Sequence, residues 1–270
     1  MALTEFQRSV CRLIARSRVA SGESYVAGGA ALNEALAAPR ISRDVDLFHD
    51  TESALDASWS ADRRLLEENG FEVRPVRERR SFVEAEVSRE RESVLLQWVK
   101  DSAFRFFPLV EHPDFGLTLH PFDLATNKVL ALVGRLEVRD WVDTIMCDGA
   151  VQPLGFLAWA ACGKDPGFSP ALILEYAARS HYSADEVGAL AFAGTMPDAA
   201  ALSRRWHAIL AAGREIIDAL PAAESGKCVL APDGALFSGV GAALANALGT
   251  KEIRFHAGSI RGALPLIVEG

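Results

Sequence analysis

Two aspartates stand two residues apart in a segment whose side chains alternate between polar and apolar. The alternation over Ile41–Phe48 predicts a strand, and Asp44 and Asp46 then project from the same face of it. Two carboxylates so close together repel each other unless a cation lies between them. Mg²⁺ takes carboxylate oxygens and keeps positions open for substrate phosphates. The pair therefore predicts a site for Mg²⁺ (or Mn²⁺), against the alternative of a solvated acidic edge strand.

A glycine pair precedes this strand. Gly28 and Gly29 follow a short apolar strand predicted at Ser24–Ala27, and they open a helix predicted at Ala30–Leu36. Without a Cβ atom, the backbone can approach a ligand closely. The first turn of the helix offers unpaired N–H groups and a positive dipole end to a phosphate. The turn is a candidate phosphate cradle, and a tight turn without a ligand is the alternative.

A third group of charged residues lies in the second half of the chain. Lys128 and Arg135 are seven residues apart on a helix predicted at Phe122–Arg135, near one face of it. That spacing lets both bases meet a polyphosphate. Asp140 and Asp143 lie three apart on the next predicted helix and can hold those bases. An ordinary salt-bridged helix pair is the alternative.

Taken together, the three groups resemble the nucleotidyltransferase superfamily with the polymerase-β-like fold. The detail is similar to its AbiEii-like branch, the toxin component of abortive-infection toxin–antitoxin pairs. The resemblance covers about half of the chain, residues 25–143. The matching motifs are Gly28–Asn33, Ser42–Phe48, and Lys128–Arg135 with Arg139, Asp140 and Asp143.

The resemblance implies a nucleoside triphosphate substrate, held through its phosphates by one or two Mg²⁺ (or Mn²⁺) ions. It implies catalytic roles for Asp44 and Asp46, both also metal ligands, and for Lys128, which would steady the leaving pyrophosphate. The implied nucleotide- and phosphate-binding residues are Gly28, Gly29, Ser42, Lys128, Arg135 and Asp140. Members of this branch are similar to enzymes that add nucleotides to RNA, notably to tRNA ends, or to proteins. A cognate antitoxin is a further implied partner.

The sequence departs from the family at the third carboxylate, which the family places on a later strand of the same sheet. Here the strand predicted at Ser93–Val99 presents Gln97, a neutral amide with only a carbonyl oxygen to offer a metal. Asp101, Glu84 and Glu86 stand nearby without following the pattern. Two other interpretations therefore stay open. One is a nucleotide-binding pseudo-enzyme, and the other is a partner-binding module without catalysis.

The order of elements predicts an α+β fold. An N-terminal nucleotidyltransferase-like domain with a mixed β-sheet is expected at residues 1–120, and a helical domain that completes the nucleotide site at 121–220. A small C-terminal β-rich appendix is expected at 221–270. Among the helices predicted in the middle domain is one at Ala184–Phe192. In the appendix, a Pro-Asp-Gly turn between apolar runs predicts a hairpin at 228–237.

Composition excludes several function classes. With 28 basic and 36 acidic residues, the net charge is −8, which excludes a general nucleic-acid binder of high pI. A local basic patch remains open, and Arg77, Arg79 and Arg80 near a predicted turn are candidates for an RNA-facing edge. Four cysteines without a CxxC pair exclude a zinc ribbon and suit a reducing compartment. Without a signal region or an apolar run of about 20 residues, we expect a soluble cytoplasmic protein with no membrane partner.

Overall fold

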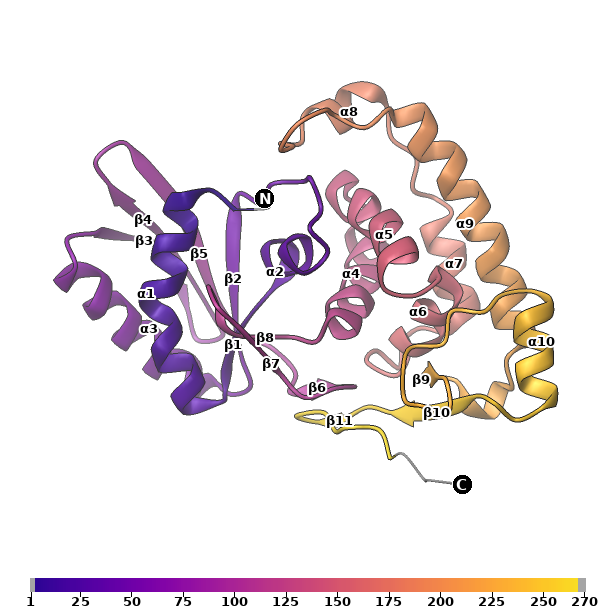
Figure 1. Cartoon of the computed structure of the whole chain (residues 1–270). Helices are drawn as coiled ribbons and strands as arrows, with labels where there is room; N and C mark the ends of the chain where they lie inside the picture. The colour runs from indigo at the N-terminus through magenta and orange to yellow at the C-terminus, as the bar shows by residue number, and fades with distance from the viewer. Residues whose placement is uncertain (1–2, 267–270) are drawn as a thin grey trace. The chain divides into compact units, whose positions relative to one another are not determined.

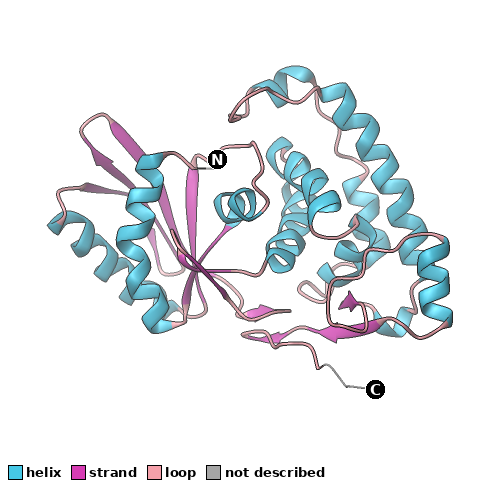
Figure 2. Ribbon diagram, viewed as in Figure 1, coloured by secondary structure: helices cyan, strands magenta, loops and turns pink. Residues whose placement is uncertain are grey.

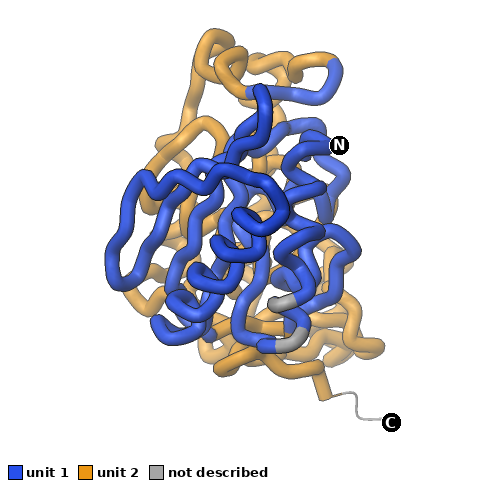
Figure 3. Tube along the Cα trace, turned by 90° about the vertical axis from the view of Figure 1, so that its left-hand side faces the viewer, with its two compact units in different colours: residues 1–103, 109–120, 191–194 blue, residues 104–108, 121–190, 195–270 orange. Residues whose placement is uncertain are grey.

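The structure is a computed structural model that describes residues 3–266 and, at positions 17 and 20, the backbone alone (Figures 1 and 2). The chain divides into two compact units (Figure 3). Unit 1 comprises residues 1–103, 109–120 and 191–194, and unit 2 comprises residues 104–108, 121–190 and 195–270. The division does not test independent folding, so the predicted separate domain at 221–270 stays a prediction.

A seven-stranded mixed sheet forms the centre of unit 1, in the order β3-β4-β5-β2-β1-β8-β7. The central strand β2 pairs in parallel with β5 and antiparallel with β1. β3, β4 and β5 form an antiparallel meander along one side. The strands are β1 (Ser24–Ala27), β2 (Asp44–His49), β3 (Glu72–Arg79), β4 (Phe82–Arg89), β5 (Glu92–Lys100), β7 (Val110–His112) and β8 (Gly116–Thr118).

Two helices cover one face of this sheet. In α1 (Glu5–Ser21), Arg18 donates to Asp62 of α3 (Glu52–Glu68) at 2.8 Å. The indole nitrogen of Trp98 on β5 donates to the same carboxylate at 2.9 Å. The apolar side chains of β2, β4 and β5 on this face are buried. A third helix, α2 (Gly28–Ala35), follows β1 directly and packs against β1 and β2.

Unit 2 is mainly helical. Its helices are α4 (Pro121–Arg135), α5 (Val138–Ala150), α6 (Leu154–Ala161), α7 (Pro170–Ala177), α8 (Ala184–Gly188), α9 (Ala199–Ala219) and α10 (Ala242–Gly249), with a 3₁₀ turn at Ala222–Glu224. Its short strands are β6 (Phe104–Arg105), β9 (Lys227–Leu230), β10 (Arg254–Ala257) and β11 (Ser259–Ile260). Every residue of α6 is buried, against α4, α7, α9 and β9. β9 adds Val229 to a cluster with Phe156 and Trp159.

The architecture confirms the predicted α+β class, with one local correction. The helix expected over Ala184–Phe192 ends at Gly188, because residues 191–193 bond in extended form to residues 39–41. The hairpin expected at 228–237 is found as a short one, in which the N–H of Ala231 donates to the carbonyl of Ala235 at 2.8 Å and Leu230 bridges Leu236. In addition, β9 pairs along its length with β10. That pairing satisfies the backbone of a buried strand with residues more than twenty positions away, which local turn chemistry does not reveal.

No helix in the described range, residues 3–266, is long and apolar enough to cross a membrane.

Candidate active site

The unit 1 face opposite α1 and α3, which we call the polar face, carries charged and amide side chains from four adjacent strands. Along β2, exposure alternates as the sequence predicts. Asp44 and Asp46 are half-buried on the polar face, and Val45 and Leu47 are buried on the other. By strand register, the polar face consists of Asp44 and Asp46 on β2, Gln97 on β5, Glu84 and Glu86 on β4, and Arg74, Arg77 and Arg79 on β3.

The glycine turn lies directly against the second aspartate. Gly28 has φ +65°, a conformation that L side chains rarely adopt. A Cβ atom at this position would overlap the carboxylate of Asp46. Glycine is therefore required here twice, by backbone conformation and by the approach of the carboxylate. The N-cap residue of α2, Ala27, makes no side-chain capping bond, and the carboxylate of Asp46 lies beside the start of the helix.

A buried arginine flanks the same turn. A Cβ atom at Gly29 would lie 2.6 Å from Nη2 of Arg40 and 3.2 Å from Oγ of Ser42. Arg40 is only 5% exposed. Ser42 in turn donates to Oδ1 of Asp44 at 3.0 Å and thereby links the turn to the first aspartate. The site thus brings a cation, a hydroxyl and the N-terminus of α2 to one end of the polar face.

Arg40 is the residue that the sequence did not single out. It stands in the irregular stretch between α2 and β2, where no periodicity reports burial. The available signal was its position, four residues before Asp44 in the segment Arg40–Asp46. A buried arginine is unusual, and its burial becomes visible only once the chain is folded.

Gln97 occupies the predicted third position. It pairs directly with Asp46 across the parallel β2–β5 ladder, so the two side chains share the polar face. Its Nε2 donates to Oε1 of Glu84 at 2.9 Å, on the next strand. The row Asp46, Gln97, Glu84 thus continues across three strands in register.

These residues suit a hard divalent cation. Mg²⁺ in proteins is commonly held by one or two carboxylates, with substrate phosphates and water supplying the remaining oxygens. Asp44 and Asp46 are two half-buried carboxylates on one strand face, beside the amide of Gln97. Over residues 3–266 there is no group of three or more His, Cys, Asp or Glu side chains placed to hold a metal. The fit is therefore to a cation that shares its coordination with a substrate.

The third predicted group lies in unit 2. Lys128 on α4 contacts Asp140 at 2.9 Å and Asp143 at 3.2 Å on α5, and Arg135 contacts Asp140 at 2.6 Å. Lys128 and both aspartates are buried, while the Arg135 side chain is 44% exposed. Burial opposes ionisation of Asp140, but the hydrogen bond from Arg135 and the charge of Lys128 outweigh it and lower the pKa of this carboxyl. That Lys128 acts on a nucleotide bound at Asp44 and Asp46 stays a prediction.

Comparisons with known proteins place the fold. No protein-family model and no curated protein matches the sequence. A candidate nucleotidyltransferase from H. pylori is similar in structure, with a TM-score of 0.52 and 17% identity, over 80% of this chain and 96% of its own. MenT4, the nucleotidyltransferase toxin Rv2826c from Mycobacterium tuberculosis H37Rv, has a TM-score of 0.51 and 16% identity, over 80% of this chain and 83% of its own.

The chain has a nucleotidyltransferase-like fold. A toxin is among its structural neighbours, which agrees with the resemblance read from the sequence. The finer AbiEii-like assignment stays a prediction. In this nucleotidyltransferase-like fold, the central strand β2 carries both aspartates, and the start of α2 lies against Asp46.

The opposite face of the sheet holds a different polar arrangement. His49 follows the two aspartates on β2 but is buried among the helices, where its ring contacts Ser24 Oγ at 3.1 Å and the carbonyl of Val99 at 3.3 Å. Burial, together with the charge of Arg18, lowers the pKa of His49 to about 4. The ring is therefore neutral near pH 7 and remote from the polar face.

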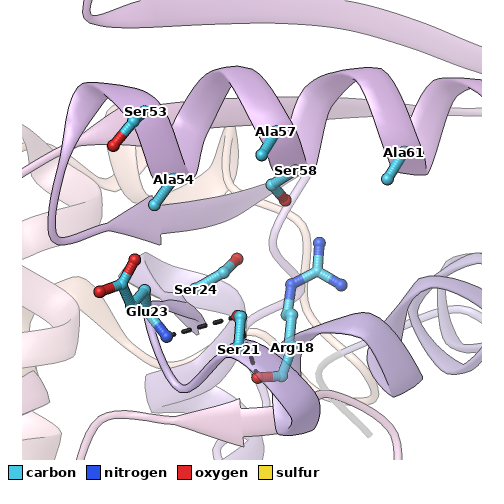
Figure 4. A pocket seen from close by; sticks show the side chains of 9 residues that line it. All are labelled: Arg18, Ser21, Glu23, Ser24, Ser53, Ala54, Ala57, Ser58 and Ala61. Atoms are coloured by element: carbon cyan, nitrogen blue, oxygen red, sulfur yellow. Dashed lines mark hydrogen bonds between the residues drawn. The ribbon is translucent and has the colours of Figure 1, made fainter.

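A hollow of about 290 Å³ opens on this helix-covered side, between α1, the start of β1 and α3 (Figure 4). Small side chains of α3, Ala54, Ala57 and Ser58, line one wall, and Arg18 and Ser24 lie opposite. None of the predicted catalytic or metal-binding residues lines it. The hollow therefore lies on the other side of the sheet from Asp44 and Asp46, which are on the polar face.

Proposed function

We propose that this protein is a nucleotidyltransferase that binds a nucleoside triphosphate with Mg²⁺ at the polar face and transfers the nucleoside monophosphate to a hydroxyl of RNA. One observation carries the proposal. Asp44 and Asp46 share one face of the central strand, and the carboxylate of Asp46 lies against the glycine turn that opens α2. A like-charged pair beside a helix N-terminus is the arrangement that a metal–triphosphate complex neutralises.

Each residue around the glycine turn has its own part in phosphate binding. The first-turn N–H groups of α2 would donate to phosphate oxygens, and Gly28 lets the start of this helix lie against the carboxylate of Asp46. Arg40, whose Nη2 lies beside Gly29, supplies positive charge at the same end, and a guanidinium is a side chain that pairs well with phosphate. Ser42 keeps Asp44 oriented through its hydrogen bond.

Asp44 and Asp46 are the carboxylates that would hold the cation, with Gln97 beside them. When bound, Mg²⁺ neutralises charge on the phosphates and lowers the pKa of an attacking hydroxyl. The chain's own contribution is placement, because both carboxylates stand on the rigid central strand of the sheet and not on a loop. Such pre-organisation favours transfer between two aligned oxygens.

An RNA acceptor is favoured by the far edge of the polar face. The exposed residues on β3 that share this face with Glu84 and Glu86 are Arg74, Arg77 and Arg79. Arg77 also lies 5.8 Å over the ring of Phe82. In a protein of net charge −8, a row of arginines on one sheet edge is a local feature that suits a phosphodiester backbone.

The test is transfer of label. Each α-labelled nucleoside triphosphate is incubated with Mg²⁺ or Mn²⁺ and either total tRNA or a protein mixture. Wild type is compared with Asp44→Asn and with the control Glu111→Gln, an exposed carboxylate on β7. We expect label in RNA with wild type and control, and loss with Asp44→Asn or a chelator. Label in protein alone overturns the RNA acceptor. Metal-dependent stabilisation by the triphosphate without transfer favours a pseudo-enzyme, and no stabilisation favours a partner-binding module.

A partner protein belongs to the same proposal. The structural neighbour MenT4 is named as a toxin, which supports the prediction that an antitoxin restrains this chain. Co-expression with the adjacent open reading frame tests it, with rescue of growth as the expected result.

A further inference from the structure

Gln97 stands between a metal-binding aspartate and a second carboxylate. Strand register places it directly beside Asp46 on one side and Glu84 on the other, all on the polar face. All three side chains are half-buried. Gln97 therefore has a carboxylate on each side, and each carboxylate attracts the NH₂ group of the amide and repels its oxygen. The orientation of the amide decides whether its oxygen or its NH₂ group faces a cation at Asp46.

The hydrogen bond to Glu84 fixes that orientation. An ionised carboxylate only accepts hydrogen bonds, so the end of the amide that faces Glu84 must be the NH₂ group. Its Nε2 donates to Glu84 Oε1 at 2.9 Å. The carbonyl oxygen of the same amide then faces away from Glu84. Without this bond, the NH₂ group of Gln97 would be drawn instead to the carboxylate of Asp46.

We propose that Glu84 is a positioning residue that holds the amide of Gln97 with its carbonyl oxygen available to the cation at Asp44 and Asp46. The inference rests on the proposed function and deepens it. Two residues then take the place of the third acid. Gln97 supplies a neutral oxygen ligand, and Glu84 on the next strand orients it. Partners that orient ligands in this way typically change metal affinity about 10–100-fold when they are lost.

The structure supplies a matched control. Glu86 lies two residues along β4, and the register aligns Asp44, Leu95 and Glu86 as it aligns Asp46, Gln97 and Glu84. Glu86 therefore has the same charge at an equivalent distance from an aspartate, but its row has no amide to orient. It pairs instead with Arg74 on β3. Both positions carry a carboxylate on the same strand face, but only Glu84 accepts a hydrogen bond from Gln97, so orientation of that amide is specific to Glu84.

The experiment measures Mn²⁺ binding by electron paramagnetic resonance, with and without a non-hydrolysable triphosphate. Glu84→Lys replaces an acceptor by a donor and turns the amide of Gln97 round, so we expect Mn²⁺ affinity to fall at least about tenfold more than in Glu86→Lys. Glu84→Gln keeps an acceptor oxygen for Nε2 and should stay within about threefold of wild type. Glu84→Ala should lie between these two variants. Melting temperatures identify any variant that fails to fold, and Glu84→Ala compared with Glu86→Ala then serves in place of the lysine variants.

The outcomes separate this inference from the proposed function. Equal losses in Glu84→Lys and Glu86→Lys, with normal Mn²⁺ binding in wild type, overturn the positioning role and leave the metal site standing. No Mn²⁺ binding in wild type, with or without the triphosphate, overturns the proposed function itself. Loss of Mn²⁺ affinity in Glu84→Lys, with affinity retained in Glu84→Gln and Glu86→Lys, supports the positioning role of Glu84.

Discussion

The polar face of unit 1 and the Lys128 group of unit 2 use the same residue types in opposite ways. In unit 2, Lys128 lies between two buried aspartates, and Arg135 shares one of them. In unit 1, Asp44 and Asp46 stand side by side and half-buried on one strand face. The first arrangement compensates charge within the fold. The second gathers like charge at an accessible face, which stabilises the protein little and suits an external cation.

The largest effect is expected where the compensation is internal. Asp140→Ala removes the partner common to Lys128 and Arg135 and leaves Lys128 buried with Asp143 alone. Breaking a buried pair in this way costs about 3–5 kcal/mol. Urea unfolding should show this loss, whereas Glu137→Ala, which removes a half-exposed partner of the same arginine, should cost less than about 1 kcal/mol. Equal small losses would mean that the buried network contributes little to the fold.

The polar face should respond in the opposite sense. Asp46→Asn removes one of two neighbouring like charges, so we expect the metal-free fold to be unchanged or slightly more stable. Transfer should fall at least about a hundredfold, or roughly 3 kcal/mol in the activation free energy, because the cation loses a carboxylate. Glu92→Gln, an exposed carboxylate at the start of β5, is the control. A marked drop in melting temperature in metal-free buffer would show that Asp46 is structural.

The features that could be predicted from the sequence are those that depend on local hydrophobic patterns. Alternation over Asp44–His49 places both aspartates on one face, and the same period on β5 selects Gln97. Two further local signals in the sequence match the structure: the capping box of Thr4 and Gln7 at the start of α1, and the left-handed Gly70 just after α3. In these segments, the period of the hydrophobic pattern alone determines which side chains point outward.

Contacts between distant segments could not be predicted in this way. The burial of Arg40 against Gly29 depends on the packing of an irregular segment. The buried pair of Lys164 with Asp123, at 2.8 Å, joins residues forty-one positions apart. The pairing of β9 with β10 joins residues more than twenty positions apart, beyond what the local turn signal at 228–237 reveals. Each depends on which surfaces meet in the fold, information that one chain's periodicity does not contain.

The helix-covered face of the unit 1 sheet holds a buried histidine that makes stability depend on pH. The pKa of His49 is lowered to about 4 by burial and by Arg18, below its ordinary value of 6.5. As the pH falls through 6.5, His49 of the unfolded chain takes up a proton, whereas the folded ring stays neutral until about pH 4. Stability present above pH 6.5 is therefore lost over that window, by about 2 kcal/mol between pH 7.5 and 5.

Urea unfolding at the two pH values measures this loss. His49→Gln should show a pH dependence about 2 kcal/mol smaller than that of wild type, and exposed His181→Gln should behave as wild type. If His49→Gln and wild type lose the same stability, the buried ring is not the group that titrates.

The smallest and sharpest test concerns the missing third acid. Gln97→Asp returns a carboxylate to the position beside Asp46, but it places that carboxylate next to Glu84, which loses the hydrogen bond that Gln97 donates to it. Two neighbouring carboxylates cannot both ionise freely, so the single variant should raise transfer only about two- to threefold. In the double variant Gln97→Asp with Glu84→Gln, the new amide donates to the new acid and relieves the repulsion. There we expect about a tenfold rise in label transfer at fixed Mg²⁺. Glu84→Gln alone is the control. If neither variant raises transfer over wild type, Gln97 already meets the needs of the site, and the polar face is complete without a third carboxylate.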